Sequence, residues 1–282
     1  MDLYLTAMIQ GLAFSVMGIG IYLTLRIFNI PDITTDGSYT LGGAVSVVLL
    51  VNGYSPWIAL IFAIISGMIA GTATGLIHTK LRVNALLAGI LVMTALYSVN
   101  LTVMGRPNIP LVDTASVFND DHFIVSILFT TITASIIILF LKTDLGIAMR
   151  ATGSSEDMVR ANGVNTSAVK ILGIAIANGL TAVSGFLMVQ YQGFSDINMG
   201  IGIVISGLAA VILGESLVSF TGARGIVAGI LAVILGSIAF RLILAAALSA
   251  GMDPNFLKLT TAVIVLLILG LTRMRSRKGG TV

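Results

Sequence analysis

The sequence has no cysteine and only two histidines, His78 and His122, among its 282 residues. The lack of cysteine excludes a disulfide framework, a thiolate metal site and a cysteine nucleophile, and two histidines exclude a histidine-rich metal site. Charge is also scarce: Asp, Glu, Lys and Arg make up 10% of the chain, against roughly 25% in a soluble domain. Because 57% of the residues are hydrophobic, the chain cannot cover a water-facing surface, which indicates a multi-pass membrane protein.

The motifs of several enzyme classes are absent as well. The sequence contains neither a GxxxxGK[ST] phosphate-binding loop nor an HExxH zinc motif, so the chain does not hydrolyse ATP through a P-loop. A serine hydrolase needs a histidine base at matching depth, and neither histidine lies well inside a hydrophobic stretch. The acidic residues lie in loops or at span ends, and the two that come nearest to the middle of the membrane, Asp36 and Glu215, are expected close to the cytoplasmic side. The lack of a carboxylate at mid-membrane argues against a proton or sodium relay.

Hydrophobic stretches of about 20 residues are long enough to cross a bilayer core of ~30 Å as helices. Eight stretches qualify: Leu3–Leu25, Trp57–Ile77, Ala85–Met104, Phe123–Leu141, Ala168–Val189, Gly200–Val218, Gly225–Leu248 and Phe256–Leu271. A ninth, Tyr39–Val51, would cover only about 20 Å and follows the polar segment Ile30–Ser38. We therefore expect an all-α, polytopic membrane helix bundle of 8–9 spans, with a short, broken or re-entrant second helix, forming a single domain over residues 1–282.

The distribution of basic residues gives an orientation. The chain carries 15 lysines and arginines. Nine crossings with the C-terminus inside leave only Arg106, Arg241 and Lys258 at the outer side and the other 12 inside, which is the positive-inside pattern. The basic balance thus reflects membrane orientation, and no nucleic-acid partner is expected. Eight crossings would move the N-terminus and Arg26 to the opposite side of the membrane and leave the rest unchanged. Arg241 is expected to extend outward to the membrane surface as an anchor.

A weak internal similarity relates the two halves of the chain. Asp32-Ile33 and Asp196-Ile197 are each followed by a glycine eleven residues later, and GMIAG at 67–71 resembles GIVAG at 225–229. With the two halves entering the membrane from opposite sides, this pattern predicts an inverted repeat with a translocation path between the halves. Small residues at four-residue spacing also allow close helix packing in lipid, so a tightly packed bundle alone explains the glycines equally.

The longest polar segment runs from Lys142 to Lys170, between two hydrophobic stretches, and interleaves basic with acidic residues. Gly146 and Gly163 bracket it and permit sharp turns. Hydroxyl-bearing residues between the two glycines can cap a short helix that has acidic residues near its N-terminus. The pattern is typical of a docking element for a soluble partner, with an ordinary positive-inside loop as the alternative.

Two motifs carry a resemblance to a known family. One is PDITTDGSYTLGGA, from Pro31 to Ala44, and the other is GIAMRAT, from Gly146 to Thr152, followed by ED at 156–157 and GVN at 163–165. With these motifs the chain resembles, over nearly its whole length, the permease subunits of bacterial ABC importers in the branched-chain amino acid and ribose permease superfamily. Within it, the chain is most similar to the uncharacterised branch associated with tryptophan or tyrosine uptake.

The resemblance implies a non-catalytic subunit of the bacterial inner membrane that carries a small solute such as an amino acid. It implies three partners: an ABC ATPase on the cytoplasmic face, a periplasmic or lipid-anchored substrate-binding protein, and a second permease copy, identical or not. This chain would bind no cofactor, because ATP and Mg belong to the ATPase. A self-sufficient secondary transporter and an ABC export permease are the alternatives.

The resemblance also implies two sets of site residues. Residues 143–167 would form the segment that couples to the ATPase, and the outer loop, about 105–122, would meet the binding protein. A solvated acidic loop without a partner explains the outer loop equally. The candidate coupling residues are Gly146, Met149, Arg150, Ala151, Glu156, Asp157, Arg160, Gly163 and Asn165. The candidate residues of the translocation path are Asp36, Ser38, Tyr39, Asn84, Asn100 and Asn178. For the three asparagines, a hydrogen bond between helices is the alternative.

Overall fold

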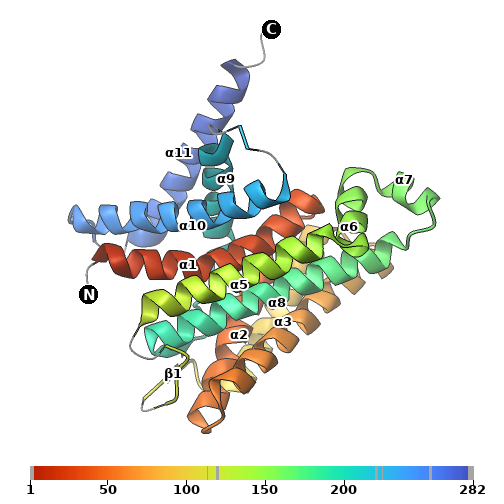
Figure 1. The fold of residues 1–282 in the computed structure, drawn as a ribbon. Coiled ribbons are helices and arrows are strands. Elements are labelled where there is room, and N and C mark those ends of the chain that lie inside the picture. Colours follow the sequence, from red (N-terminus) through yellow and green to blue (C-terminus); the bar gives the residue numbers. More distant parts are fainter. Residues whose placement is uncertain are drawn as a thin grey trace.

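The computed structural model describes residues 3–112, 114–118, 121–219, 222–223, 225–253 and 256–278. It is almost entirely helical (Figure 1). The long helices are α1 (Leu3–Tyr22), α2 (Thr34–Val51), α3 (Pro56–Lys80), α4 (Ala85–Met104), α5 (His122–Lys142), α8 (Thr166–Gln192), α9 (Ile203–Ser219), α10 (Ile226–Ser249) and α11 (Leu257–Lys278). The short elements are the π-helix η1 (Leu23–Ile27), α6 (Asp144–Ser154), α7 (Glu156–Ala161) and the strands β1 (Asn108–Pro110) and β2 (Phe194–Asp196).

Six helices of the described part are long and apolar enough to cross a membrane: α1 with η1, α3, α4, α5, α8 and α10. Helix α9 and the first part of α11, Leu257–Leu267, are apolar but shorter. The chain is thus a multi-pass membrane protein. Length and composition support six spans and do not confirm the expected eight to nine.

The small β-sheet is the exception to the all-α expectation. Strands β1 and β2 pair antiparallel with Asn108 opposite Asp196 and Pro110 opposite Phe194. They join the segment after α4 to the segment after α8 at the end of the molecule opposite α6 and α7 (Figure 1). Residues 113, 119 and 120 of the expected outer loop lie outside the described residues.

The second helix is longer than the sequence suggested. Helix α2 is regular over 18 residues and begins at Thr34, five residues before the expected start at Tyr39. The carboxylate of Asp32 accepts a hydrogen bond from the Thr34 amide at 2.9 Å, and the Thr35 hydroxyl donates to the Asp32 carbonyl at 3.2 Å. These side chains stabilise the first turn of a helix. The expected start at Tyr39 was wrong, because the polar residues from Thr34 to Ser38 begin the helix rather than precede it.

Helices α1 and α8 form the centre of the bundle. In each, 78% of the most apolar window is buried, against 28–33% in α3, α4, α5 and α10. Glycines bring the neighbouring helices close to this centre. A Cβ added to Gly71 of α3 would lie 2.5 Å from the carbonyl oxygen of Ile174 in α8, and one added to Gly11 of α1 would lie 2.8 Å from Ile238 of α10. Helix α3 therefore packs on α8, and α10 packs on α1, at the close backbone distances that small residues allow.

Arg241 of α10 points into the bundle. Its guanidinium lies 3.7 Å from the centroid of the Phe14 ring and donates a hydrogen bond to Gln10 Oε1 at 3.2 Å. Both partners belong to α1, so a cation–π contact and a hydrogen bond hold the arginine inside. The expectation that Arg241 extends outward was wrong, because its partners lie on a helix that only the folded chain brings beside it.

Candidate functional sites

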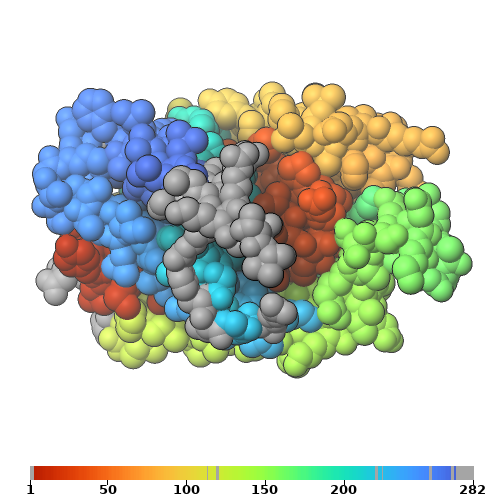
Figure 2. Space-filling view, turned by 90° about the horizontal axis from the view of Figure 1, so that it is seen from above, coloured from red at the N-terminus to blue at the C-terminus, as the bar shows by residue number. Residues whose placement is uncertain are grey.

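The segment between α5 and α8 forms two short helices rather than the single one expected. Thr143 precedes α6, and its hydroxyl oxygen accepts a hydrogen bond from the Gly146 amide at 3.4 Å. Ser155 separates α6 from α7 in an extended conformation. Gly163 then adopts a left-handed conformation (φ 81°), and the side chain of Asn165 caps α8 by accepting from the Ala168 amide at 3.1 Å. Helices α6 and α7 project at one end of the molecule, away from most of α10 and α11 (Figure 2).

The inner face of α6 is anchored to the bundle. Met149 is 1% exposed and belongs to the main apolar core. A Cβ added to Gly153 would overlap the carbonyl oxygen of Ile27 in η1, so α6 rests on the backbone at the end of α1. Arg150 and Asp157 are exposed, and Met158 is 68% exposed. The segment therefore has a buried side that packs against the bundle and a charged side that is available to another molecule. Ala151 is half-buried at the boundary of the two sides.

A charged network ties α7 to the start of α8. The Glu156 carboxylate receives hydrogen bonds from Lys170 Nζ at 2.5 Å, Arg160 NH2 at 2.8 Å and the Thr166 hydroxyl at 3.0 Å. The Lys170 ammonium is the main cause that lowers the pKa of Glu156, and Thr166 and Arg160 act in the same direction. The network brings together two predicted coupling residues, Glu156 and Arg160, with two that sequence reasoning missed, Thr166 and Lys170. The spacing of four residues between Glu156 and Arg160 was the only local signal.

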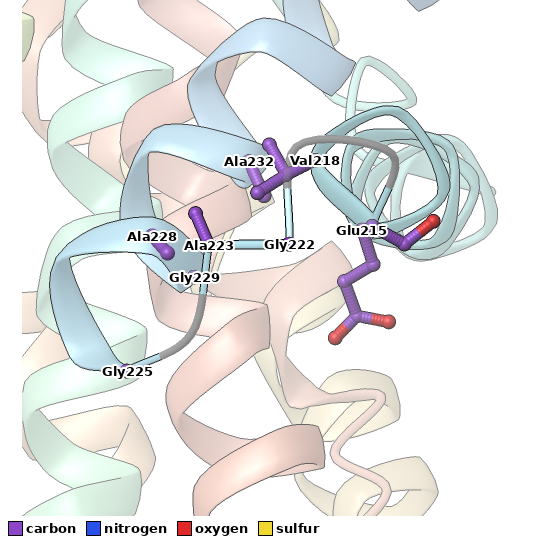
Figure 3. Close-up of a pocket in the computed structure, with 9 residues that line it drawn as sticks. Glu215, Val218, Gly222, Ala223, Gly225, Ala228, Gly229 and Ala232 are labelled. Carbon is purple, nitrogen blue, oxygen red and sulfur yellow. The ribbon is translucent and has the colours of Figure 1, made fainter.

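A second ion pair lies at the end of α1. Arg26 of η1 pairs with Glu215 of α9, joining two helices far apart in the sequence. Beside it, a cavity of about 340 Å³ opens between the end of α9 and the start of α10 (Figure 3). Its lining consists of Glu215, Val218, Ser219, Gly222, Ala223, Gly225, Ala228, Gly229 and Ala232. The Arg26–Glu215 pair thus connects η1, on which α6 rests, with α9.

Asp36 lies beside the middle of α4 rather than at the end of a span. The next residue, Gly37, packs against Leu96, and the Asn100 amide donates to the Gly37 carbonyl at 3.2 Å. The Asp36 carboxylate accepts hydrogen bonds from the amides of Gly202 at 2.8 Å and Val204 at 2.9 Å, so it caps α9. The expectation that Asp36 lies near the cytoplasmic side was wrong, because α2 and α9 both begin beside the middles of other helices.

A fully buried polar group lies next to this point. Asn178, in the middle of α8, donates to Asp32 Oδ2 at 2.7 Å and accepts from the Ser38 hydroxyl at 2.7 Å. Tyr39 is 2% exposed and stacks on Phe14 with ring centroids 5.7 Å apart. These candidate path residues are packed between helices in this conformation, and their contact with solute stays a prediction.

The remaining candidate path residues lie apart from that group. Asn84 is exposed and caps α4 by accepting from the Leu86 amide at 2.9 Å. Asp36 and Asn100 line a cavity of about 240 Å³ between α2, α4 and the segment before α9. Its lining consists of Asp36, Gly37, Thr40, Met93, Thr94, Tyr97, Asn100, Ile197 and Ile201. The spacing of three residues from Thr94 to Tyr97 to Asn100 on one apolar helix was a signal for this cavity.

These observations define a helical, multi-pass membrane protein with a projecting pair of short helices at one end and a mostly apolar cavity, lined by Asp36, where α2 and α9 begin. The fold resembles that of a solved structure described as an inward-facing conformation of a putative metal-chelate type ABC transporter. The TM-score is 0.52 at 14% identity, covering 97% of this chain and 85% of that one.

Sequence comparison then identifies the family. Residues 3–272 match the family described as branched-chain amino acid transport system / permease component, and the chain belongs to that family. It is 41% identical over 268 residues to a tyrosine transport system permease protein of Clostridioides difficile, covering 94% of this chain and 90% of the relative. It is 35% identical over 274 residues to an uncharacterized protein of Rickettsia prowazekii, covering 95% and 97%.

Family membership confirms the resemblance inferred from the two motifs. The chain is the permease subunit of an ABC importer, a non-catalytic membrane component whose ATPase is a separate chain. ATPase and substrate-binding partners follow from that membership. The secondary-transporter and export alternatives have no support among these relatives.

Proposed function

We propose that this chain, with a second permease copy, forms the path for an amino acid across the bacterial inner membrane. A periplasmic or lipid-anchored binding protein delivers the solute, and an ABC ATPase docked on α6 and α7 drives transport. The amino acid is tyrosine or a close analogue, a proposal supported by the similarity to the tyrosine transport permease. This chain binds no cofactor of its own.

The geometry of α6 and α7 carries the proposal. Their inner side contacts η1 through Gly153, the bundle core through Met149, and α8 through the hydrogen bonds of Glu156. Their outer side exposes Arg150 and Asp157. A partner that pulls on this outer side moves the end of α1 with it, because α6 rests directly on the η1 backbone. From there the Arg26–Glu215 ion pair passes the movement to α9.

The shorter helices α2, α9 and α11 complete nine crossings in this proposal, with the N-terminus outside and the C-terminus inside. Helices α1 to α4 and α8 to α11 then form an inverted repeat. Two observations support it: α3 packs on α8 as α10 packs on α1, and a similar aspartate-stabilised turn precedes α2 and α9. In that turn Asp32 accepts from the Thr34 amide at 2.9 Å, and Asp196 accepts from the Asn198 amide at 2.8 Å.

The test is ATP hydrolysis by the reconstituted complex with and without solute-loaded binding protein. We expect Arg150→Glu to abolish the stimulation by binding protein, because the substitution reverses a charge on the exposed side of α6. Lys80→Glu is the matched control, since Lys80 is exposed and ends α3, outside α6 and α7. Wild-type stimulation in Arg150→Glu, or equal loss in both variants, contradicts docking through this segment.

A further inference from the structure

The cavity of about 240 Å³ between α2 and α4 is lined mostly by apolar surface. Among its polar side chains, the Asp36 carboxylate and the hydroxyls of Thr40 and Thr94 offer only acceptors. The Thr40 hydroxyl donates its hydrogen to the Asp36 carbonyl at 3.2 Å, and the Thr94 hydroxyl donates to the Ile90 carbonyl at 2.8 Å. Each hydroxyl has one hydrogen, so both oxygens face a solute only as acceptors. The lining residues include no lysine, arginine or histidine.

Asn100 adds an acceptor that has no partner in the described part of the chain. Its side chain is 1% exposed, and its Nδ2 donates to the Gly37 carbonyl at 3.2 Å, while Oδ1 accepts no hydrogen bond from the described residues. A buried carbonyl oxygen without a donor destabilises the folded chain. Asn100 lines the cavity, so a solute donor that reaches this buried oxygen would complete its hydrogen bonding.

The place in the cavity that would hold an anion is already filled. The start of α9 offers free amides and the positive end of a helix dipole. The carboxylate of Asp36 occupies it, accepting from Gly202 and Val204. The Asp36 charge therefore repels a solute carboxylate, which cannot reach those amides. An ammonium group can instead donate to the remaining lone pairs of the Asp36 carboxylate.

The cavity opens between side chains that are exposed on the bundle surface: Tyr97 is 47% and Ile201 58% exposed. A carboxylate-lined cavity at the middle of spanning helices faces water or protein rather than lipid tails. The solute path, or the second permease copy that encloses it, therefore lies on this side of the molecule. Met93, Tyr97 and the two isoleucines add apolar and aromatic surface next to the acceptors.

From these contacts we infer that the cavity is a transit site for the protonated amino group of the solute, with Asn100 as a specificity-determining residue. Solutes with a primary ammonium and an apolar or aromatic body enter it, and their deaminated analogues do not. The inference rests on the proposed function for its solute class. It adds a selection step in the membrane subunit, after the binding protein has released its cargo.

The experiment measures equilibrium binding to the purified full-length permease in lipid nanodiscs, without ATPase or binding protein. The probes are radiolabelled tyramine, which has the amine alone, and 3-(4-hydroxyphenyl)propionate, which has the carboxylate alone. We expect tyramine to bind at least tenfold more tightly than the propionate. Equal binding of the two probes, or no saturable tyramine binding, overturns the inference.

Variants at Asn100 tie the binding to the cavity. Asn100→Leu removes the acceptor and should weaken tyramine binding at least tenfold, while Asn100→Asp keeps an acceptor and should retain it. Thr102→Val on the same helix, outside the cavity, is the control. Unchanged binding in Asn100→Leu, or equal loss in Asn100→Leu and Asn100→Asp, contradicts the role of the Oδ1 acceptor.

Stimulation of ATP hydrolysis by the binding protein separates this inference from the proposed function. If the wild-type complex shows stimulation and the permease fails to prefer tyramine, only the amino-group site is wrong. If the complex shows no stimulation, the importer assignment fails whatever the permease binds.

Discussion

Removal of the Glu156 carboxylate should detach α7 from the start of α8. Glu156→Gln keeps the size and shape of the side chain but loses the charge that holds Lys170, Arg160 and Thr166 together. The matched control is Asp157→Asn, the same change at the next residue. Asp157 is exposed and makes no ion pair with the residues that the structure describes.

Exposure decides how much each contact of Glu156 contributes. Arg160 is 62% exposed, so its pair with Glu156, four residues apart on one helix turn, contributes about 0.3–0.5 kcal/mol. Lys170 is only 16% exposed, and a hydrogen bond between charged groups contributes about 1.5–3 kcal/mol. Because Glu156 itself is 32% exposed, we take the lower end of that range. The total of about 2 kcal/mol corresponds to a roughly thirtyfold change in local opening.

Hydrogen–deuterium exchange of the backbone amides in 156–170 measures this opening directly. We expect exchange in Glu156→Gln to be ten- to thirtyfold faster than in the wild type and in Asp157→Asn. The folded protein lowers the pKa of Glu156, so the stabilisation is present above the ordinary carboxyl pKa and is lost as pH falls through the lowered value. The difference between wild type and Glu156→Gln should therefore be full at pH 7 and vanish in acid. Equal exchange in the two variants at neutral pH would refute the network as an anchor of α7.

Two further substitutions test the packing of α8. Gly71→Val should lower the thermal unfolding temperature in detergent, because a Cβ at 2.5 Å from an α8 carbonyl forces α3 and α8 apart, and overpacking costs about 1–3 kcal/mol. Gly270→Val, where a Cβ meets no described atom within 4 Å, should leave the temperature within a degree or two; equal losses would contradict the close contact. Asn178→Leu removes the donor to the buried Asp32 carboxylate. It should lower the stability by about 1.5–3 kcal/mol, measured by the same thermal unfolding. An unchanged unfolding temperature in Asn178→Asp, which also lacks the amide donor, would show that the donor is dispensable.

Hydrophobicity and charge were sufficient to predict a multi-pass membrane protein and the position of the projecting segment between α5 and α8. Both signals are local: a window of twenty residues reveals a span, and a run of charges between spans reveals a projecting segment. The split into α6 and α7 was missed, since an extended Ser155 is not distinguishable from a helical one by residue type. The burial of Met149 was missed as well, because it depends on contact with the bundle.

The largest errors concerned polar residues whose partners lie far away in the chain. Asp36 was placed near the surface because it follows a polar run, yet its hydrogen-bond donors lie 166 and 168 residues further on. Arg241 was assigned to the surface because arginine in a span usually extends outward, yet its acceptor is 231 residues away. A local pattern reveals that such a side chain needs a partner, and only the assembled fold reveals which partner it has.

The central position of α1 has a consequence for how the protein is made. This helix leaves the ribosome well before three of the helices that pack against it, α8, α9 and α10. Until synthesis reaches Ser249, the end of α10, α1 lacks part of its packing, and α5 is the main helix already made that contacts it. Chains that stop before α8 lack one of the two most buried helices. We expect their remaining helices to pack loosely and to be degraded by membrane proteases. Assembly of the bundle is therefore completed only after nearly the whole chain has been inserted.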